Sequence, residues 1–100
     1  MDTHLQTIII RFDDTASQIY SDVFHQFQEF MNNTDRSVNE NIYKMQEAKA
    51  IFSLKNRLEQ LTAELLEKNK DYPLYTQLHA SFSARVDYYL QEFRRKTTSG

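Results

Sequence analysis

The fold follows most directly from a stretch near the middle of the chain that reads LKNRLEQLTAELLEKNKDYP, residues 54–73. This stretch places leucine at steps of four and three, the spacing of one face of an α-helix, at Leu54, Leu58, Leu61 and Leu65. Its last six residues combine two lysines with Asn69, Asp71 and Pro73. Because proline disfavours helix in the residue before it, one helix should end near residue 70. A new helix can then begin at Pro73.

Outward from this stretch, two further helices are expected. Residues 32–36, Asn-Asn-Thr-Asp-Arg, form the clearest turn upstream, because Asn and Asp compete with helical backbone bonding. We therefore expect helices at about 4–32, 38–70 and 73–97. Pro73 is the single proline, and the single glycine is Gly100, so little else in the chain interrupts a helix. The sequence predicts an all-α, elongated three-helix bundle with antiparallel, coiled-coil-like helices.

Each helix has an apolar seam that predicts its buried face. One hundred residues suit a single domain, and the tail 97–100 is expected to fray. The first seam is expected to comprise Leu5, Ile9, Phe12, Ala16, Ile19, Val23, Gln26 and Phe30. The second begins Val38, Ile42, Met45 and Phe52 and rotates to Ile51, Leu54, Leu58, Leu61 and Leu65, which implies a change of neighbour along the helix. The third comprises Tyr75, His79, Phe82, Val86, Tyr89 and Phe93.

The composition limits the classes of function. The chain has no cysteine, so it can form neither disulfides nor thiolate metal sites. No apolar run approaches the roughly 20 residues of a membrane span, and the first residues do not resemble a signal peptide. We therefore expect a cytoplasmic protein that does not enter a membrane.

Nothing in the chain predicts catalysis or a cofactor. Asp22, His25 and Glu29 share a helical face, but a carboxylate-bridged metal site in a helical bundle needs further ligands that the chain does not repeat. Glu64-Leu65-Leu66-Glu67 resembles half of the magnesium motif of small helical nucleotide pyrophosphatases, whereas 84–87, Ala-Arg-Val-Asp, lacks an acid of the second half. We therefore expect no enzyme, no catalytic residues, no cofactor and no metal.

A second row of mainly aromatic residues runs beside the seams. The apolar surface of the helices is therefore wider than one neighbouring helix would cover. Aromatic residues carry large contact areas and dominate protein interfaces. We interpret the chain as a protein-interaction module, such as an adaptor, small chaperone, inhibitor or assembly factor, whose simplest partner is a second copy. The row could equally be core. The candidate interface residues are Tyr20, Phe24, Phe27, Met31, Tyr88, Tyr89 and Phe93.

Two alternative functions stay open. Tyr88 and Glu92 form a Tyr-x-x-x-Glu pattern similar to the export motif of small helical substrates and targeting partners of type VII secretion, although the Trp-x-Gly turn of that family is missing. The other alternative is a nucleic-acid-binding regulator that contacts phosphates through Arg94, Arg95 and Lys96. The net charge of −2 makes nucleic acid the less expected partner.

Overall fold

The computed structural model describes residues 3–32 and 40–98 and shows three helices in this part of the chain. Helix α1 is Thr3–Asn32, α2 is Glu40–Lys68 and α3 is Tyr75–Thr98. The predicted all-α three-helix bundle is thus confirmed. The β-branched run at residues 7–10 lies inside α1. The expected start of the second helix at Val38 lies outside the described residues.

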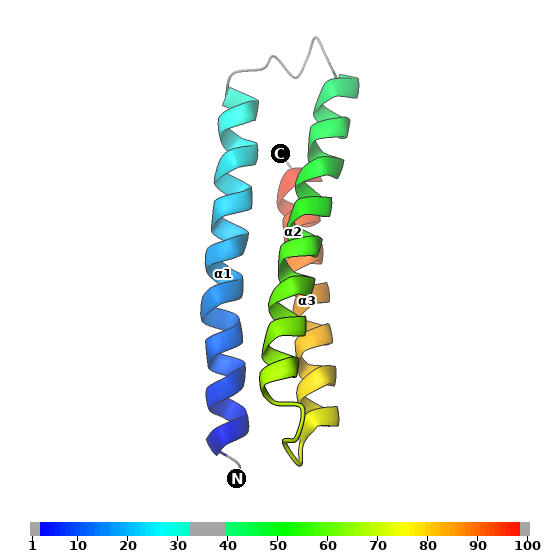
Figure 1. Ribbon diagram of the computed structural model, residues 1–100. Helices are drawn as coiled ribbons and strands as arrows, with labels where there is room; N and C mark the ends of the chain where they lie inside the picture. Colours follow the sequence, from blue (N-terminus) through cyan, green and yellow to red (C-terminus); the bar gives the residue numbers. More distant parts are fainter. Residues whose placement is uncertain (1–2, 33–39, 99–100) are drawn as a thin grey trace.

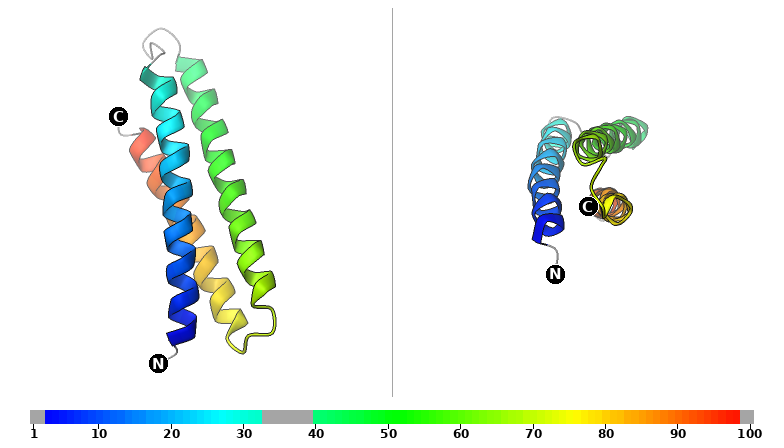
Figure 2. Two further views of the ribbon diagram at one scale, coloured as in Figure 1. Left: turned by 60° about the vertical axis from the view of Figure 1, so that its left-hand side comes forward. Right: turned by 60° about the horizontal axis from the view of Figure 1, so that its bottom comes forward.

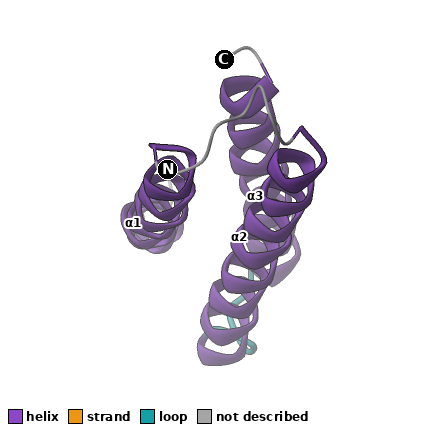
Figure 3. Ribbon diagram, turned by 90° about the horizontal axis from the view of Figure 1, so that it is seen from above, coloured by secondary structure: helices purple, strands orange, loops and turns teal. Residues whose placement is uncertain are grey.

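The helices run up, down and up, as Figure 1 shows. In the right-hand view of Figure 2, turned toward the lower end of the bundle, they stand at the corners of a triangle, and each helix packs against both others. The view from above in Figure 3 shows the three helices with α1 to the left of α2 and α3. The molecule measures 54 × 19 × 17 Å, and its radius of gyration of 16.1 Å exceeds the roughly 13 Å of a compact chain of this length. The elongated shape gives every helix a long outward face.

The turn at residues 69–74 reverses the chain between α2 and α3. The Asn69 side-chain amide donates to the Leu65 carbonyl at 2.7 Å, which satisfies a carbonyl at the end of α2. The backbone N–H of Tyr72 then donates to the Asn69 carbonyl, and that of Tyr75 donates to the Tyr72 carbonyl. Pro73 lies in this turn, two residues before α3 begins, rather than in the first turn of the helix.

The core is a continuous apolar column along the bundle axis. Its members are contributed by all three helices and include rings stacked across the bundle, such as Phe12 on Phe82 with centroids 4.5 Å apart. The fully buried large side chains are Phe12, Leu54, Leu58, Leu78, Phe82 and Phe93. These residues confirm much of the predicted seams.

The observed seams depart from the predicted ones in each helix. In α1 Gln26, predicted on the seam, is exposed, and the neighbouring Phe27 is buried instead. A buried Gln26 amide would need hydrogen-bond partners. In α3 Leu78 is fully buried, and His79, predicted on the seam, is exposed. In α2 Tyr43 is buried on the same side as Leu54, whereas Met45 and Phe52, also predicted on the seam, are 51% and 65% exposed.

The end of α3 is held in place where fraying was expected. Thr97 is buried, and its backbone carbonyl accepts a 2.6 Å hydrogen bond from the Tyr43 hydroxyl of α2. This bond satisfies an otherwise orphaned carbonyl at a helix end. The helix therefore continues to Thr98, and residues 99–100 lie outside the described residues.

Within residues 3–32 and 40–98, no helix combines the length and apolarity needed to cross a membrane.

Candidate protein-interaction surface

The aromatic row predicted from the sequence forms a cluster between α1 and α3. Phe93 of α3 is fully buried, and its ring contacts three rings of α1 at centroid distances of 5.8–5.9 Å, mostly edge to face: Tyr20, Phe24 and Phe27. Phe27 also meets Tyr43 of α2 at 5.6 Å. Such geometry is favourable for aromatic pairs. The bundle itself therefore covers Phe27 and Phe93, which leaves little of either ring for a partner.

The other members of the row lie at the edge of the cluster. Tyr20, Phe24, Met31 and Tyr89 are half-buried, and Tyr88 is 58% exposed. The Tyr20 hydroxyl is buried and has no hydrogen-bond partner among residues 3–32 and 40–98, which carries a desolvation cost. For these residues, an additional contact with a partner stays a prediction.

The basic end of α3 is partly engaged within the chain. The Lys96 ammonium lies 5.2 Å from the Tyr20 ring centroid and 5.5 Å from that of Phe24, within cation–π range. Arg95 donates to Glu92 at 2.7 Å, and this hydrogen bond is the main cause that lowers the pKa of the Glu92 carboxyl. Arg94 is exposed. Two of the three cations predicted to bind phosphate thus have intramolecular roles.

The two residues of the predicted export motif, Tyr88 and Glu92, lie one helical turn apart on α3. Tyr88 is exposed and Glu92 is half-buried. The Tyr88 hydroxyl adds to the hydrogen bonding that lowers the Glu92 pKa, after the larger effect of Arg95. The two side chains therefore share one surface of α3.

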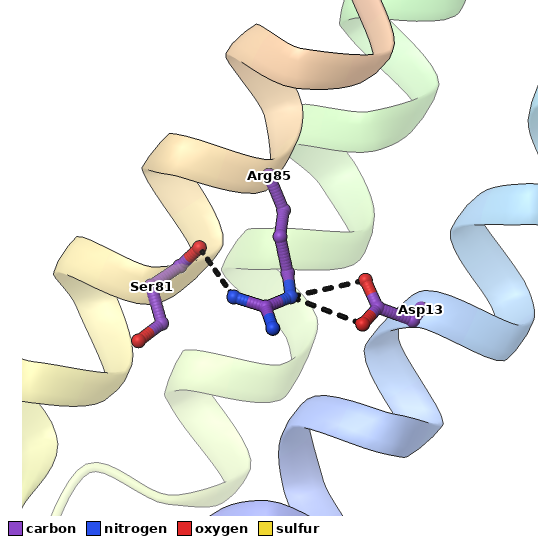
Figure 4. Close-up of polar contacts among 3 residues, drawn as sticks. All are labelled: Asp13, Ser81 and Arg85. Carbon is purple, nitrogen blue, oxygen red and sulfur yellow. Dashed lines mark hydrogen bonds and ion pairs between the residues drawn. The ribbon is translucent and has the colours of Figure 1, made fainter.

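A polar contact joins α1 to α3 beside this surface. Figure 4 shows the Arg85 Nε donating to both carboxylate oxygens of Asp13, at 3.1 and 3.0 Å, while a terminal nitrogen faces the Ser81 carbonyl at 3.5 Å. The pKa of the adjacent Tyr89 phenol is raised, mainly by burial and next by the charge of Asp13. The pair of Arg85 and Asp13 links α1 to α3. Because both charged side chains are more than a third exposed, it adds only modestly to stability.

The acidic and imidazole side chains do not assemble into a metal site in the described part of the chain. Asp22 instead faces Arg57 of α2 at 3.7 Å. His25 and Glu29 are exposed further along α1. Glu64 and Glu67 are exposed on α2, and Asp87 is exposed on α3.

A groove of about 620 Å³ runs between the first half of α1 and the end of α2. Its lining mixes apolar side chains with charges of both signs, among them Arg11, Asp14, Glu64 and Lys68. Mixed charges of this kind do not select an anionic or a cationic ligand.

The face of α2 that points away from the core is the clearest uncovered apolar surface. At about 100° per residue, Met45 lies roughly 180° and Phe52 roughly 160° around the helix from the buried Leu54. Asn56 and Ala63 continue the same line and are exposed. We call these four residues, Met45, Phe52, Asn56 and Ala63, the α2 outer face.

The heptad pattern of the sequence does not reveal this surface, because it places Met45 and Phe52 on the seam. The step from Ile42 to Met45 fits a heptad, but the leucines that follow lie on the opposite side of the helix. Measuring the angles from Leu54 would have placed the two residues outside.

Comparisons with family models, curated proteins and solved structures found no match to this chain.

Proposed function

We propose that the chain is a non-enzymatic protein-interaction module, of the adaptor, small chaperone, inhibitor or assembly-factor type, that binds a helical partner through the α2 outer face. The observation that carries the proposal is the exposure of Phe52 and Met45 on the side of α2 opposite the core. Full burial of one such side chain is worth roughly 1.5–3 kcal/mol. Because Met45 is 51% and Phe52 is 65% exposed, a partner that covers both would gain roughly the free energy of fully burying one such side chain.

The spacing of the two residues suits a helix as the partner. Met45 and Phe52 are seven residues apart and therefore lie about 10 Å apart along the same side of α2. Ala63 adds a small side chain that allows close approach of another helix. Helices recognise one another through anchors at these intervals.

The other exposed apolar residues support this choice by their isolation. Ile10 lies on α1 and Tyr88 on α3. Single exposed apolar side chains are normal on protein surfaces. Only α2 carries two large ones on one face in the part of the chain that the structure describes.

Photocrosslinking in cells that produce the protein tests the proposal. A benzophenone amino acid at position 52 should yield crosslinked protein adducts. The same group at Gln77, an exposed residue on the outer side of α3, serves as the matched control and should yield none. Absence of adducts at position 52, or equal adducts at both positions, would contradict the proposal.

A further inference from the structure

We propose that the occupant of the α2 outer face is the α2 helix of a second copy of this chain, running antiparallel to the first. This inference rests on the proposed function and adds the identity and the direction of the partner. It is based on the charges that flank the α2 outer face.

The flanking charges divide by sign along the helix. Lys49 and Lys55 precede Glu59 and Glu67 along the flanks of the α2 outer face, and the Lys55 ammonium also lies 4.0 Å from the Glu59 carboxylate of its own helix. All four are exposed. A parallel pair of α2 helices would place the two basic halves together and the two acidic halves together. An antiparallel pair places each basic half against an acidic half, which is attractive.

The positions around the helix agree with the antiparallel arrangement. In such a pair the two-fold axis is perpendicular to the helices, so each flank faces the same flank of the other copy. Lys49 and Glu67 are 18 residues apart, five full turns, and so lie on one flank. Lys55 and Glu59, one turn apart, lie on the other.

One register satisfies both flanks and Phe52, and it sets Met45 against the turn that follows α2 of the second copy. It pairs Lys49 with Glu67 of the second copy and Lys55 with Glu59 of the second copy. The same register sets Phe52 against Ala63 of the second copy, a large side chain on a small one. The three pairs are centred at residues 57–58. Asn56 lies beside that centre, where a polar residue can specify register and direction.

The surface that this dimer would cover is one that the three-helix bundle leaves exposed. The core side chains of α2 face α1 and α3, which occupy the other two corners of the triangle in Figure 2. Pairing through the α2 outer face therefore requires no opening of the bundle. The dimer would be two three-helix bundles joined along α2.

Charge reversal tests the pairing and its direction. Light scattering and sedimentation equilibrium on the purified chain should give twice the 12.0 kDa chain mass. Lys49→Glu and Glu67→Lys should each weaken the dimer roughly tenfold at low salt, because each reversal alters two symmetric pairs. Arg94→Glu and Asp87→Lys, reversals at exposed positions on α3, are the matched controls and should leave the dissociation constant unchanged.

Mixing the two variants provides the decisive measurement. Lys49→Glu presents acids at both ends of the flank, and Glu67→Lys presents bases at both ends. A one-to-one mixture should therefore form heterodimers with at least wild-type affinity, measured with differently tagged chains. Positions 49 and 67 are too far apart within one helix to pair with each other, so recovery must come from the second copy.

The outcomes separate this inference from the proposed function. A wild-type dimer that the reversals do not weaken, or a mixture that does not pair, overturns the antiparallel α2 arrangement. A monomeric wild type that still gives position-52 adducts heavier than two chains would overturn self-pairing and leave the interaction module standing. A monomer without adducts overturns both. Circular dichroism of each variant should match the wild-type helical signal.

Discussion

Replacement of Phe93 by alanine should be among the most destabilising single changes in this chain. The ring is fully buried and contacts Tyr20, Phe24 and Phe27 across the α1–α3 boundary. Phe→Ala in a well-packed core costs about 3–5 kcal/mol from lost transfer free energy and the cavity left behind. Small domains have only about 5–15 kcal/mol of stability in total. Phe93→Ala should therefore lower the melting temperature by roughly 15 °C or more.

The same substitution at Phe52 provides a matched control with the opposite environment. Phe52 is 65% exposed and forms no part of the core, so Phe52→Ala should change monomer stability by less than about 0.5 kcal/mol. The assay is urea unfolding followed by circular dichroism. It should be performed at concentrations low enough that the wild-type midpoint no longer depends on concentration, because dimerisation adds to apparent stability.

Equal losses at the two positions would refute the core assignment. A small loss at Phe93 would mean that the aromatic cluster is loosely packed and that the bundle draws its stability elsewhere. A large loss of monomer stability on Phe52→Ala would mean that α2 is rotated about its axis, so that Phe52 faces the core as the seam predicted.

Two further perturbations probe the contacts at the end of the bundle and beside Asp13. Tyr43→Phe should cost about 1 kcal/mol in urea unfolding, because the buried carbonyl of Thr97 loses its donor, whereas Tyr88→Phe, at an exposed position, should cost almost nothing. Burial and the Asp13 charge raise the folded-state pKa of Tyr89, so the stability from its neutral phenol is complete below pH 10 and is lost as the pH rises through that pKa. Tyr89→Phe should flatten the alkaline fall in the urea midpoint above pH 10, and an unchanged slope would count against the burial of this phenol.

The turn between α2 and α3 could be predicted from the sequence because local chemistry determines where α2 ends. The run of helix-compatible residues ends at Asn69 to Pro73, and the structure reverses the chain there. The end of α3 could not be predicted in this way. Thr97 is held by the hydroxyl of Tyr43, a residue 54 positions away, and no local pattern marks that pairing.

The buried face of each helix depends on neighbours that periodicity does not identify. In α3, Leu78 and His79 both fit a stripe of apolar character, and the position of α1 and α2 decides that Leu78 is inside. In α2, the apolar residues cover two opposite sides, so a single seam drawn through Met45, Phe52 and Leu54 crosses the helix. The core side is recognised by its four buried members, Tyr43, Leu54, Leu58 and Leu66, once the partners of α2 are known.

The uncovered apolar side of α2 could not be predicted from the sequence for the same physical reason. Large aromatic area was expected to mark an interface, yet the bundle already uses most of it: Phe27 and Phe93 close the core, and Lys96 lies over the rings of Tyr20 and Phe24. Apolar surface is available for a partner only where the fold leaves it uncovered, and that is a property of three packed helices together. On α2 the uncovered side coincides with a segregation of lysine from glutamate, Lys49 and Lys55 before Glu59 and Glu67. Core packing does not require that segregation, because all four side chains are exposed. It does match what an antiparallel copy of the same helix would need.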